Sequence, residues 1–358
     1  MWPDRRLMDL FKIEHPIVLA PMAGAVDWEL AAEVAQAGAL GSLPCAMLTP
    51  AQLREQFEKI RVRTKKPINV NFFCHTPPVP NNAREHAWRE RLKPYYVEFG
   101  IDPAAPVPSS NRTPFDAAFC AAIEELTPEI VSFHFGLPDA VLVKRVKAAG
   151  CIVMSSATTA KEARWLEDHG CDVVIAQGAE AGGHRGMFLT DSLETQVGSF
   201  ALVPQVVDAV KVPVTATGAI TDARGIAAAF ALGAAGVQIG TAYMFCPESK
   251  ILPPHRAALK TAHDDGTAIT NLMTGRPARG FINRVMREIG PMNDIAPEFP
   301  LAGGALAPLH AKAQAQGSGD FSSMWSGQAA SLGREMPARE LTATLAGEAQ
   351  EIPRRMAA

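Results

Sequence analysis

The chain has 358 residues, of which 47% are hydrophobic and 20% charged, and its formal net charge is −3. This composition predicts a folded globular protein and excludes a disordered chain, and the charge gives no sign of a nucleic-acid partner. No stretch approaches ~18 consecutive apolar residues, and the N-terminal segment lacks the apolar core of a secretory signal. We therefore expect a cytoplasmic protein with no membrane partner.

The chain contains six cysteines, but no two of them form a CxxC pair. Scattered cysteines are typical of free thiols in an intracellular protein rather than of a disulfide or zinc framework. Cys246 is expected to pack rather than to act as a nucleophile. Seven of the nine histidines show no metal-ligand spacing, so we expect no metal site; they are His15, His75, His86, His169, His255, His263 and His310.

Short apolar runs alternate with amphipathic stretches along most of the chain. The apolar runs predict strands at 16–22, 39–45, 68–75, 130–136, 151–157, 172–178, 213–219 and 236–242. The amphipathic stretches predict helices at 28–37, 50–63, 115–126, 139–148, 159–169 and 222–232. Several of these helices begin beside a candidate N-cap residue, namely Asp27, Thr49, Asp139, Thr158 or Thr221.

Eight strand–helix units in sequence predict an α/β protein, a parallel (β/α)8 TIM barrel with a C-terminal helical subdomain. A doubly wound open sheet is the alternative, but no GxGxxG turn opens the chain. We expect the barrel at 1–267, with a proline-rich insertion at about 76–111. The tail, 268–358, is expected to be a helical extension packed on the barrel, with helical patches at 280–289 and 338–350 and with Trp325 as an anchor.

A glycine-rich loop follows the sixth predicted strand and holds a single histidine, His184, within AQGAEAGGHRG (176–186). Glycine lets a backbone approach a ligand closely, and histidine moves protons near neutral pH. Barrel enzymes place their sites at the carboxyl ends of the strands. The loop is therefore a candidate active site, and a flexible loop with a surface histidine is the alternative.

Two further strand ends carry Gly218 and the pair Gly240–Thr241. Barrels commonly bind phosphate on the loops after strands seven and eight, so we interpret these turns as a phosphate cradle. Ordinary barrel turns are the alternative. Asn71 and Gln177 add amide groups that suit the edge of a heterocycle, although each alone is more often a satisfied core amide. Together these features favour flavin mononucleotide (FMN).

Four segments carry a resemblance to a known family, and they read PIVLAPMAG (16–24), VSFHFGLP (131–138), AQGAEAGGHRG (176–186) and VQIGTAYMFCPES (237–249). The chain resembles the class I nitronate monooxygenases, flavin-dependent enzymes. The resemblance implies His184 as the catalytic histidine and His134 as a second histidine that faces the substrate. It also implies an FMN site made of Met22, Ala23, Asn71, Gln177, Gly182, Gly218, Gln238, Ile239, Gly240 and Thr241.

The resemblance also implies a reaction. Alkyl nitronates of the propionate 3-nitronate type would be oxidised by O2, through a flavin semiquinone, to a carbonyl compound plus nitrite or nitrate. A neutral nitroalkane would first need His184 as a general base, whereas a nitronate would need His184 and His134 only to hold the anion. The partners we expect are therefore a nitronate or nitroalkane and O2.

The chain departs from the family pattern at two places. Many relatives carry a second glycine after Gly218, where this chain has Ala219. The family's closing segment often brings tyrosines and a lysine, whereas FPLAGGALAPL (299–309) brings neither, so binding of a carboxylated nitronate is expected to weaken. The alternatives are an FMN-dependent NAD(P)H:quinone or enoyl-thioester reductase of a related barrel family, and a non-catalytic barrel that binds a phosphorylated ligand.

Overall fold

The computed structural model describes residues 2–108, 110 and 112–356. Its central element is an eight-stranded parallel sheet in the order β1-β9-β8-β6-β5-β4-β3-β2. The eight strands are β1 (Ile17–Leu19), β2 (Gly41–Pro44), β3 (Ile68–Phe73), β4 (Ile130–His134), β5 (Ile152–Ala157), β6 (Val173–Gln177), β8 (Val214–Thr217) and β9 (Gly236–Ile239). All eight fall within the predicted runs.

The sheet closes into a barrel through its two edge strands, β1 and β2. Val18 bridges Leu40 in parallel, and the Leu19 amide donates a hydrogen bond of 2.9 Å to the Leu40 carbonyl. Apolar β-branched residues suit such strands because helices cover a parallel barrel from outside while side chains fill it from inside. In β6, for example, Val173 and Val174 are fully buried. The predicted (β/α)8 barrel is confirmed.

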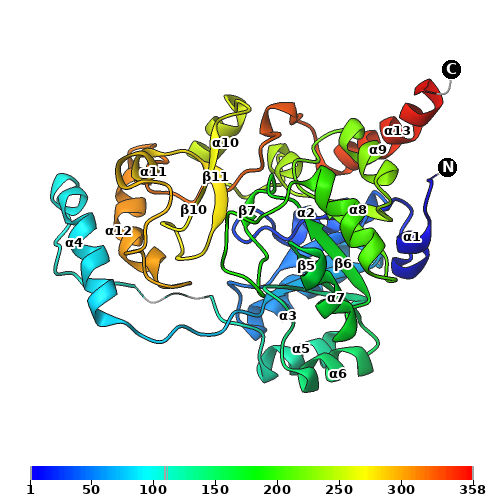
Figure 1. The fold of residues 1–358 in the computed structure, drawn as a ribbon, viewed down its shortest axis with the longest axis horizontal. Helices are drawn as coiled ribbons and strands as arrows, with labels where there is room; N and C mark the ends of the chain where they lie inside the picture. Colours follow the sequence, from blue (N-terminus) through cyan, green and yellow to red (C-terminus); the bar gives the residue numbers. More distant parts are fainter. Residues whose placement is uncertain (1, 109, 111, 357–358) are drawn as a thin grey trace.

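Helices connect the strands around the outside of the barrel (Figure 1). They are α2 (Trp28–Gln36), α3 (Pro50–Arg63), α5 (Ala117–Leu126), α6 (Ala140–Ala148), α7 (Ala160–Asp168), α8 (Ser199–Ala209) and α9 (Ala223–Ala231), and a short helix α1 (Arg6–Phe11) precedes β1. Of these helices, α1 and α8, which contains Pro204, lie outside the predicted stretches.

The helix caps correct part of the sequence prediction. Asp27 accepts from the Glu29 amide, and Thr49 forms a reciprocal capping box with Gln52, as predicted. Asp139 makes no side-chain cap bond. The caps of α7 and α9 are Thr159 and Asp222, each one residue after the predicted Thr158 and Thr221, because the side chain nearer the first helical turn reaches the free amides.

The tail is not purely helical. It begins with an antiparallel hairpin of β10 (Thr267–Thr270) and β11 (Ala278–Phe281), and β11 also pairs with the short strand β7 (Gly183–His184). The helix expected at 280–289 therefore starts later, as α11 (Arg284–Ile289), with Asn283 as its N-cap. Strand β7, within the glycine loop of the barrel, is thus the third strand of a sheet whose other two strands are β10 and β11.

The predicted insertion contains α4 (Asn82–Glu98), which lies beside α12 (Ala302–Ala315) from the tail (Figure 1). The Trp88 indole donates to the Ala302 carbonyl at 3.1 Å. Trp88, Leu92 and Tyr96 are buried at helical spacing, a pattern that a sequence can show. Insertion and tail therefore share one apolar cluster at the side of the barrel.

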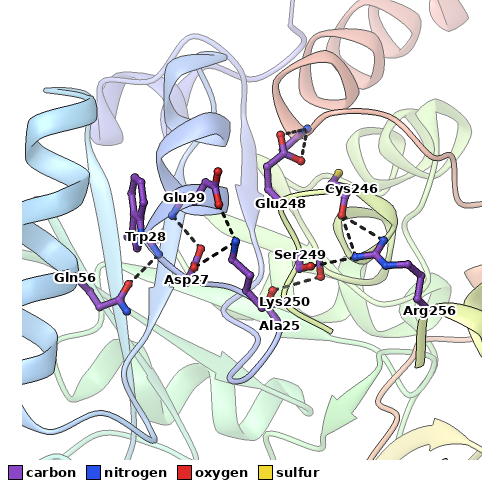
Figure 2. Close-up of polar contacts among 11 residues, drawn as sticks. Ala25, Asp27, Trp28, Glu29, Gln56, Cys246, Glu248, Ser249, Lys250 and Arg256 are labelled. Carbon is purple, nitrogen blue, oxygen red and sulfur yellow. Dashed lines mark hydrogen bonds and ion pairs between the residues drawn. The ribbon is translucent and has the colours of Figure 1, made fainter. Parts of the chain in front are cut away.

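The end of the tail returns to the barrel as α13 (Ala338–Met356), which packs on α9 and α2. Figure 2 shows the polar contacts at this junction. Lys250 contacts Glu29 at 2.7 Å and Asp27 at 3.7 Å, while Glu248 accepts from the Ala338 amide at 3.1 Å. The segment after β9 therefore joins the start of α2 to the start of α13.

Three smaller elements complete the chain: η1 (Thr241–Phe245), α10 (Pro253–Lys260) and η2 (Ala330–Leu332). Over the described residues, we find no helix with the length and apolar character needed to cross a membrane.

Candidate active site

A cavity of about 550 Å³ opens where the barrel strands end. Its wall combines the loops after the strands, the glycine loop and parts of the tail. Of the predicted site residues, those that line it are Met22, Ala23, Asn71, His134, Gln177, Gly182, His184, Gly218, Gln238, Gly240 and Thr241. Ile239 does not line the cavity, because successive side chains of a strand alternate: Gln238 lines the cavity, whereas Ile239 faces the other side of the sheet and is fully buried.

His184 lies on β7, where it is paired with Ala278 of the tail hairpin. Its Nε2 atom is 2.9 Å from the hydroxyl of Thr274, in the turn between β10 and β11. Four aromatic rings stand around the imidazole with centroids at 5.3 to 5.9 Å, those of Phe73, Phe135, Phe299 and Trp325. The barrel and the tail therefore position this histidine jointly.

Burial lowers the pKa of His184 well below its usual value, and the nearby cations of Arg112 and Arg276 add to this effect. A buried imidazole loses the solvation that stabilises its charged form. His184 is therefore neutral at physiological pH. In the tautomer in which Nε2–H donates to the Thr274 hydroxyl, Nδ1 is the nitrogen that can accept a proton from a ligand.

His134, at the end of β4, uses both of its ring nitrogens within the protein. Nε2 lies 3.2 Å from the His184 carbonyl, which can only accept, so this nitrogen carries the hydrogen. Nδ1 then accepts from the Ser156 hydroxyl at 2.6 Å. Burial lowers the pKa of His134 to about 3, so the ring stays neutral. His134 thus holds the backbone of His184 in place.

The Gln177 side chain fixes the same loop from β6. Its amide donates to the His184 carbonyl at 2.9 Å and accepts from the Gly186 amide at 2.7 Å. Arg185 completes the arrangement from inside, because its buried guanidinium donates to the carbonyls of Gly178 and Gln177 at 2.6 and 2.9 Å. Gln177 therefore orients the loop as well as lining the cavity.

The glycines of this loop allow close packing within the protein. A Cβ atom on Gly182 would lie 2.5 Å from the Gly327 amide nitrogen of the tail. A Cβ atom on Gly186 would lie 2.9 Å from the His134 ring. The sequence pattern predicted close approach to a ligand, but at these two positions the close neighbour is the chain itself.

Two amide side chains present polar atoms at the cavity. Asn71 donates to the Ser132 hydroxyl at 2.9 Å, which fixes its orientation. Gln238 has a buried Oε1 atom for which the described residues offer no hydrogen-bond partner. A buried acceptor without a partner costs free energy, so Gln238 suits a ligand that donates to it.

The predicted phosphate turns lie side by side, because β8 and β9 are neighbours in the barrel. Gly218 has φ +134° and is followed by Ala219 with φ +53°, a left-handed conformation that costs a residue with a Cβ atom. This explains physically why a second glycine suits the turn. Thr241 accepts from the Gly327 amide at 3.0 Å, so the tail also reaches the second turn.

Several lining residues were outside the sequence prediction. The insertion contributes Arg112, the hairpin turn contributes Thr274, and α12 contributes His310 beside Gly303 and Gly304. These residues carry no local motif, and their place in the site depends on how distant segments pack. Phe135 follows His134 and does not line the cavity; it adopts φ +71°, and the Arg276 guanidinium lies over its ring, 4.0 Å from the centroid.

Comparisons with known proteins agree with this geometry. A sequence profile of the nitronate monooxygenase family matches residues 4–348. The chain is 41% identical to the nitronate monooxygenase of Pseudomonas aeruginosa, over 96% of this chain and 98% of the relative. It is also similar to the crystal structure of a nitroalkane oxidase from Streptomyces ansochromogenes, with a TM-score of 0.89, 35% identity and coverage of 98% and 99% of the two chains.

A second solved structure, FabK from Thermotoga maritima, has a TM-score of 0.76 at 28% identity and covers 100% of this chain and 99% of its own. The fold is therefore shared beyond one family, whereas the sequence profile and the higher identities point to a single one. The chain belongs to the nitronate monooxygenase family, a family of flavin-dependent oxidoreductases.

Proposed function

We propose that this enzyme binds FMN and oxidises alkyl nitronates with O2 to a carbonyl compound plus nitrite or nitrate. The observation that carries the proposal is the neutral, buried His184 at the wall of the strand-end cavity, in a chain of this family. The relatives support it: one is named a nitronate monooxygenase and another a nitroalkane oxidase.

The cavity fits FMN in three respects. Its volume of about 550 Å³ is within the range of small-molecule sites. The orphaned Gln238 acceptor suits an N–H group at the polar edge of a flavin. The adjacent turns at Gly218 and Gly240 suit a phosphate, and we propose that Asn71, Gln177 and Thr241 complete the binding site. Met22 and Ala23 would lie near the ring.

When bound, FMN would supply electron transfer from the substrate to O2. The chain's own part is to place the substrate and to manage one proton. With a nitroalkane, neutral His184 can take the α-proton on Nδ1 when its Nε2–H donates to the Thr274 hydroxyl. With a nitronate no proton need be removed, and the walls of the cavity only bind and orient the anion. His134 and Gln177 act by fixing the loop that carries His184.

A second candidate is an FMN-dependent NAD(P)H:quinone or enoyl-thioester reductase. It stays the alternative because the fold is shared beyond the nitronate monooxygenase family, as the similarity to FabK over the whole chain shows. The two proposals differ in the electron donor, which is the nitronate itself in one case and NAD(P)H in the other.

Oxygen uptake separates these two functions. We expect the purified protein to consume O2 and release nitrite when propyl-1-nitronate is added, without NAD(P)H. Acid-released flavin should co-migrate with FMN on chromatography. Rapid NADH or NADPH consumption with a quinone or an enoyl thioester, and no reaction with the nitronate, would establish the reductase instead.

A further inference from the structure

Among the described residues, the cavity wall carries a positive charge and no negative charge. Among the described residues that line it there is no aspartate, glutamate or lysine, and Arg112 is the one side chain that carries a permanent charge. The other titratable lining groups are histidines, of which His134 and His184 are neutral at physiological pH. Such a wall favours anionic ligands over cationic ones.

Among the described residues, Arg112 has no counter-ion. In the described part of the chain, no carboxylate lies within 4.0 Å of its guanidinium and no hydrogen bond involves that group, although the residue is partly buried. Burial also lowers the pKa of Arg112. A buried cation without a partner is costly, so an arginine held in this state is suited to an anion from outside.

Two other arginines show the contrast. Arg185 donates from three nitrogens to Gly178, Gln177 and Gln196, so its hydrogen-bonding capacity is used inside the protein. Arg276 donates to the Met187 carbonyl and lies over the Phe135 ring. Neither of these two arginines lines the cavity. Arg112 makes no such contact and faces the cavity instead.

Arg112 belongs to the reactive side of the cavity. It comes from the segment between β3 and β4, whereas the predicted phosphate turns follow β8 and β9, across the barrel. Of the charges that act on His184, that of Arg112 is the strongest, and it also acts on His75. Because Arg112 and His184 line the same cavity, a small substrate beside His184 shares that space with the guanidinium.

We propose that Arg112 determines substrate specificity by binding the carboxylate of a nitronate that carries a second anionic group. A planar guanidinium forms paired hydrogen bonds with a carboxylate, which suits this role. Arg112 would then replace the lysine that the closing segment lacks, and carboxylated nitronates would remain good substrates. The inference rests on the proposed function, since it concerns the substrate of that same reaction.

The test compares two nitronates that differ at one end, propionate 3-nitronate and propyl-1-nitronate, in which a methyl group replaces the carboxylate. The variants are Arg112→Met, which removes the charge, and Arg112→Lys, which keeps it. Arg91→Met is the control: Arg91 also belongs to the insertion, but it donates to the Glu288 carbonyl and does not line the cavity.

We expect the ratio of kcat/KM for the carboxylated nitronate to that for propyl-1-nitronate to fall roughly ten- to one hundredfold in Arg112→Met, as for a lost charge-assisted hydrogen bond. Arg112→Lys should recover part of the ratio, and Arg91→Met should keep that of the wild type. Because both substrates are measured on one preparation, incomplete folding cancels from the ratio.

Binding gives a second readout without turnover. Succinate has the shape of propionate 3-nitronate and is unreactive, and butyrate matches propyl-1-nitronate in the same way. Calorimetric titration of the holoenzyme should show that Arg112→Met weakens succinate more than butyrate. An unchanged specificity ratio would overturn the inference, and equal losses on both nitronates would do so too, because Arg112 would then bind the nitronate group. A wild type that oxidises neither nitronate would instead defeat the proposed function.

Discussion

His184 and His134 lie at the same wall of the cavity but are held differently, and this difference decides what each can do. Both ring nitrogens of His134 form hydrogen bonds within the protein, one with the Ser156 hydroxyl and one with the His184 carbonyl. His184 pairs one nitrogen with Thr274, which leaves the other for a ligand. Of the two histidines, His184 is therefore the candidate base, and His134 is a positioning residue.

Replacing His184 by asparagine tests this assignment. Removal of a general base typically costs about 10²- to 10⁴-fold, and only a neutral nitroalkane needs its α-proton taken by the enzyme. We expect His184→Asn to lower kcat/KM for nitroethane far more than for ethyl nitronate. Steady-state oxygen uptake with both substrates measures this. Equal losses on the two substrates would contradict the base role.

A sequence motif can place a residue at the site, but it does not show which distant residues will hydrogen-bond to it. The motifs around His184 and His134 predicted two histidines at the cavity, and both line it. The expectation that His134 faces the substrate depended on partners that no motif encodes, since Ser156 belongs to the next strand and the His184 carbonyl to a distant loop. Thr274 and Arg112 likewise lie far from the histidine motifs in the sequence, so no local pattern indicates that they belong to the site.

At the scale of elements, the glycine loop is held between the barrel and the tail. Gly182 packs against Gly327, and β7 pairs with β11. The alternation of apolar and helical segments predicted every barrel strand, because each such element follows its own periodicity. A two-residue strand such as β7 has no periodicity, and its partner lies about a hundred residues later, so the three-stranded sheet was beyond the sequence pattern.

Gly182→Ala tests the contact between the loop and the tail. The added Cβ atom would lie 2.5 Å from the Gly327 nitrogen, so backbone must move. Overpacking of this kind costs about 1–3 kcal/mol of unfolding free energy. As the matched control, Gly347→Ala on an exposed position of α13 meets nothing within 4 Å and should stabilise the protein by up to about 1 kcal/mol. Urea denaturation of both variants and of the wild type measures the unfolding free energies. If Gly182→Ala proved as stable as the wild type, the contact between loop and tail would be refuted.

The turn after β9 provides a test of cofactor binding. A Cβ atom at Gly240 would lie 3.2 Å from the Met22 sulfur and 3.3 Å from Ala20. The larger valine side chain would therefore fill the space that we assign to FMN. We expect Gly240→Val to fold, as judged by circular dichroism, but to lose its visible flavin absorbance. A fully flavinated variant would contradict the proposed cradle.

At the scale of the whole molecule, barrel and tail share the cavity. Parts of the tail line it, and α13 packs on the outside of the barrel. The domain division at 267/268 stays a prediction. The site, however, needs both sides of that boundary, since His184 lies before it and Thr274 after it.

Buried histidines make the stability of the whole molecule depend on pH. Burial lowers the pKa of His134 to about 3 and those of His75 and His255 to about 4, and that of His184 falls well below its usual value. Below pH ~6.5 the unfolded chain takes up protons at these side chains while the folded chain does not, so the unfolding free energy decreases as pH falls.

We expect a loss of about 1.4 kcal/mol per pH unit for each such histidine once the pH is well below the unfolded value. Urea denaturation at pH 7.5, 6.5 and 5.5 measures the slope, in a window where carboxylates contribute little. His255→Gln should reduce it. A urea concentration at the unfolding midpoint that stays constant from pH 7.5 to 5.5 would show that these side chains are solvated in the folded protein.

In the proposed function, a nitronate delivers its electrons to a bound flavin without help from NAD(P)H. The most direct measurement is the visible absorption spectrum of the purified protein before and after anaerobic addition of propionate 3-nitronate. We predict a flavin spectrum that changes to that of a reduced form on this addition alone. A flavin that stays oxidised until NADH is added would contradict the claim and establish a reductase.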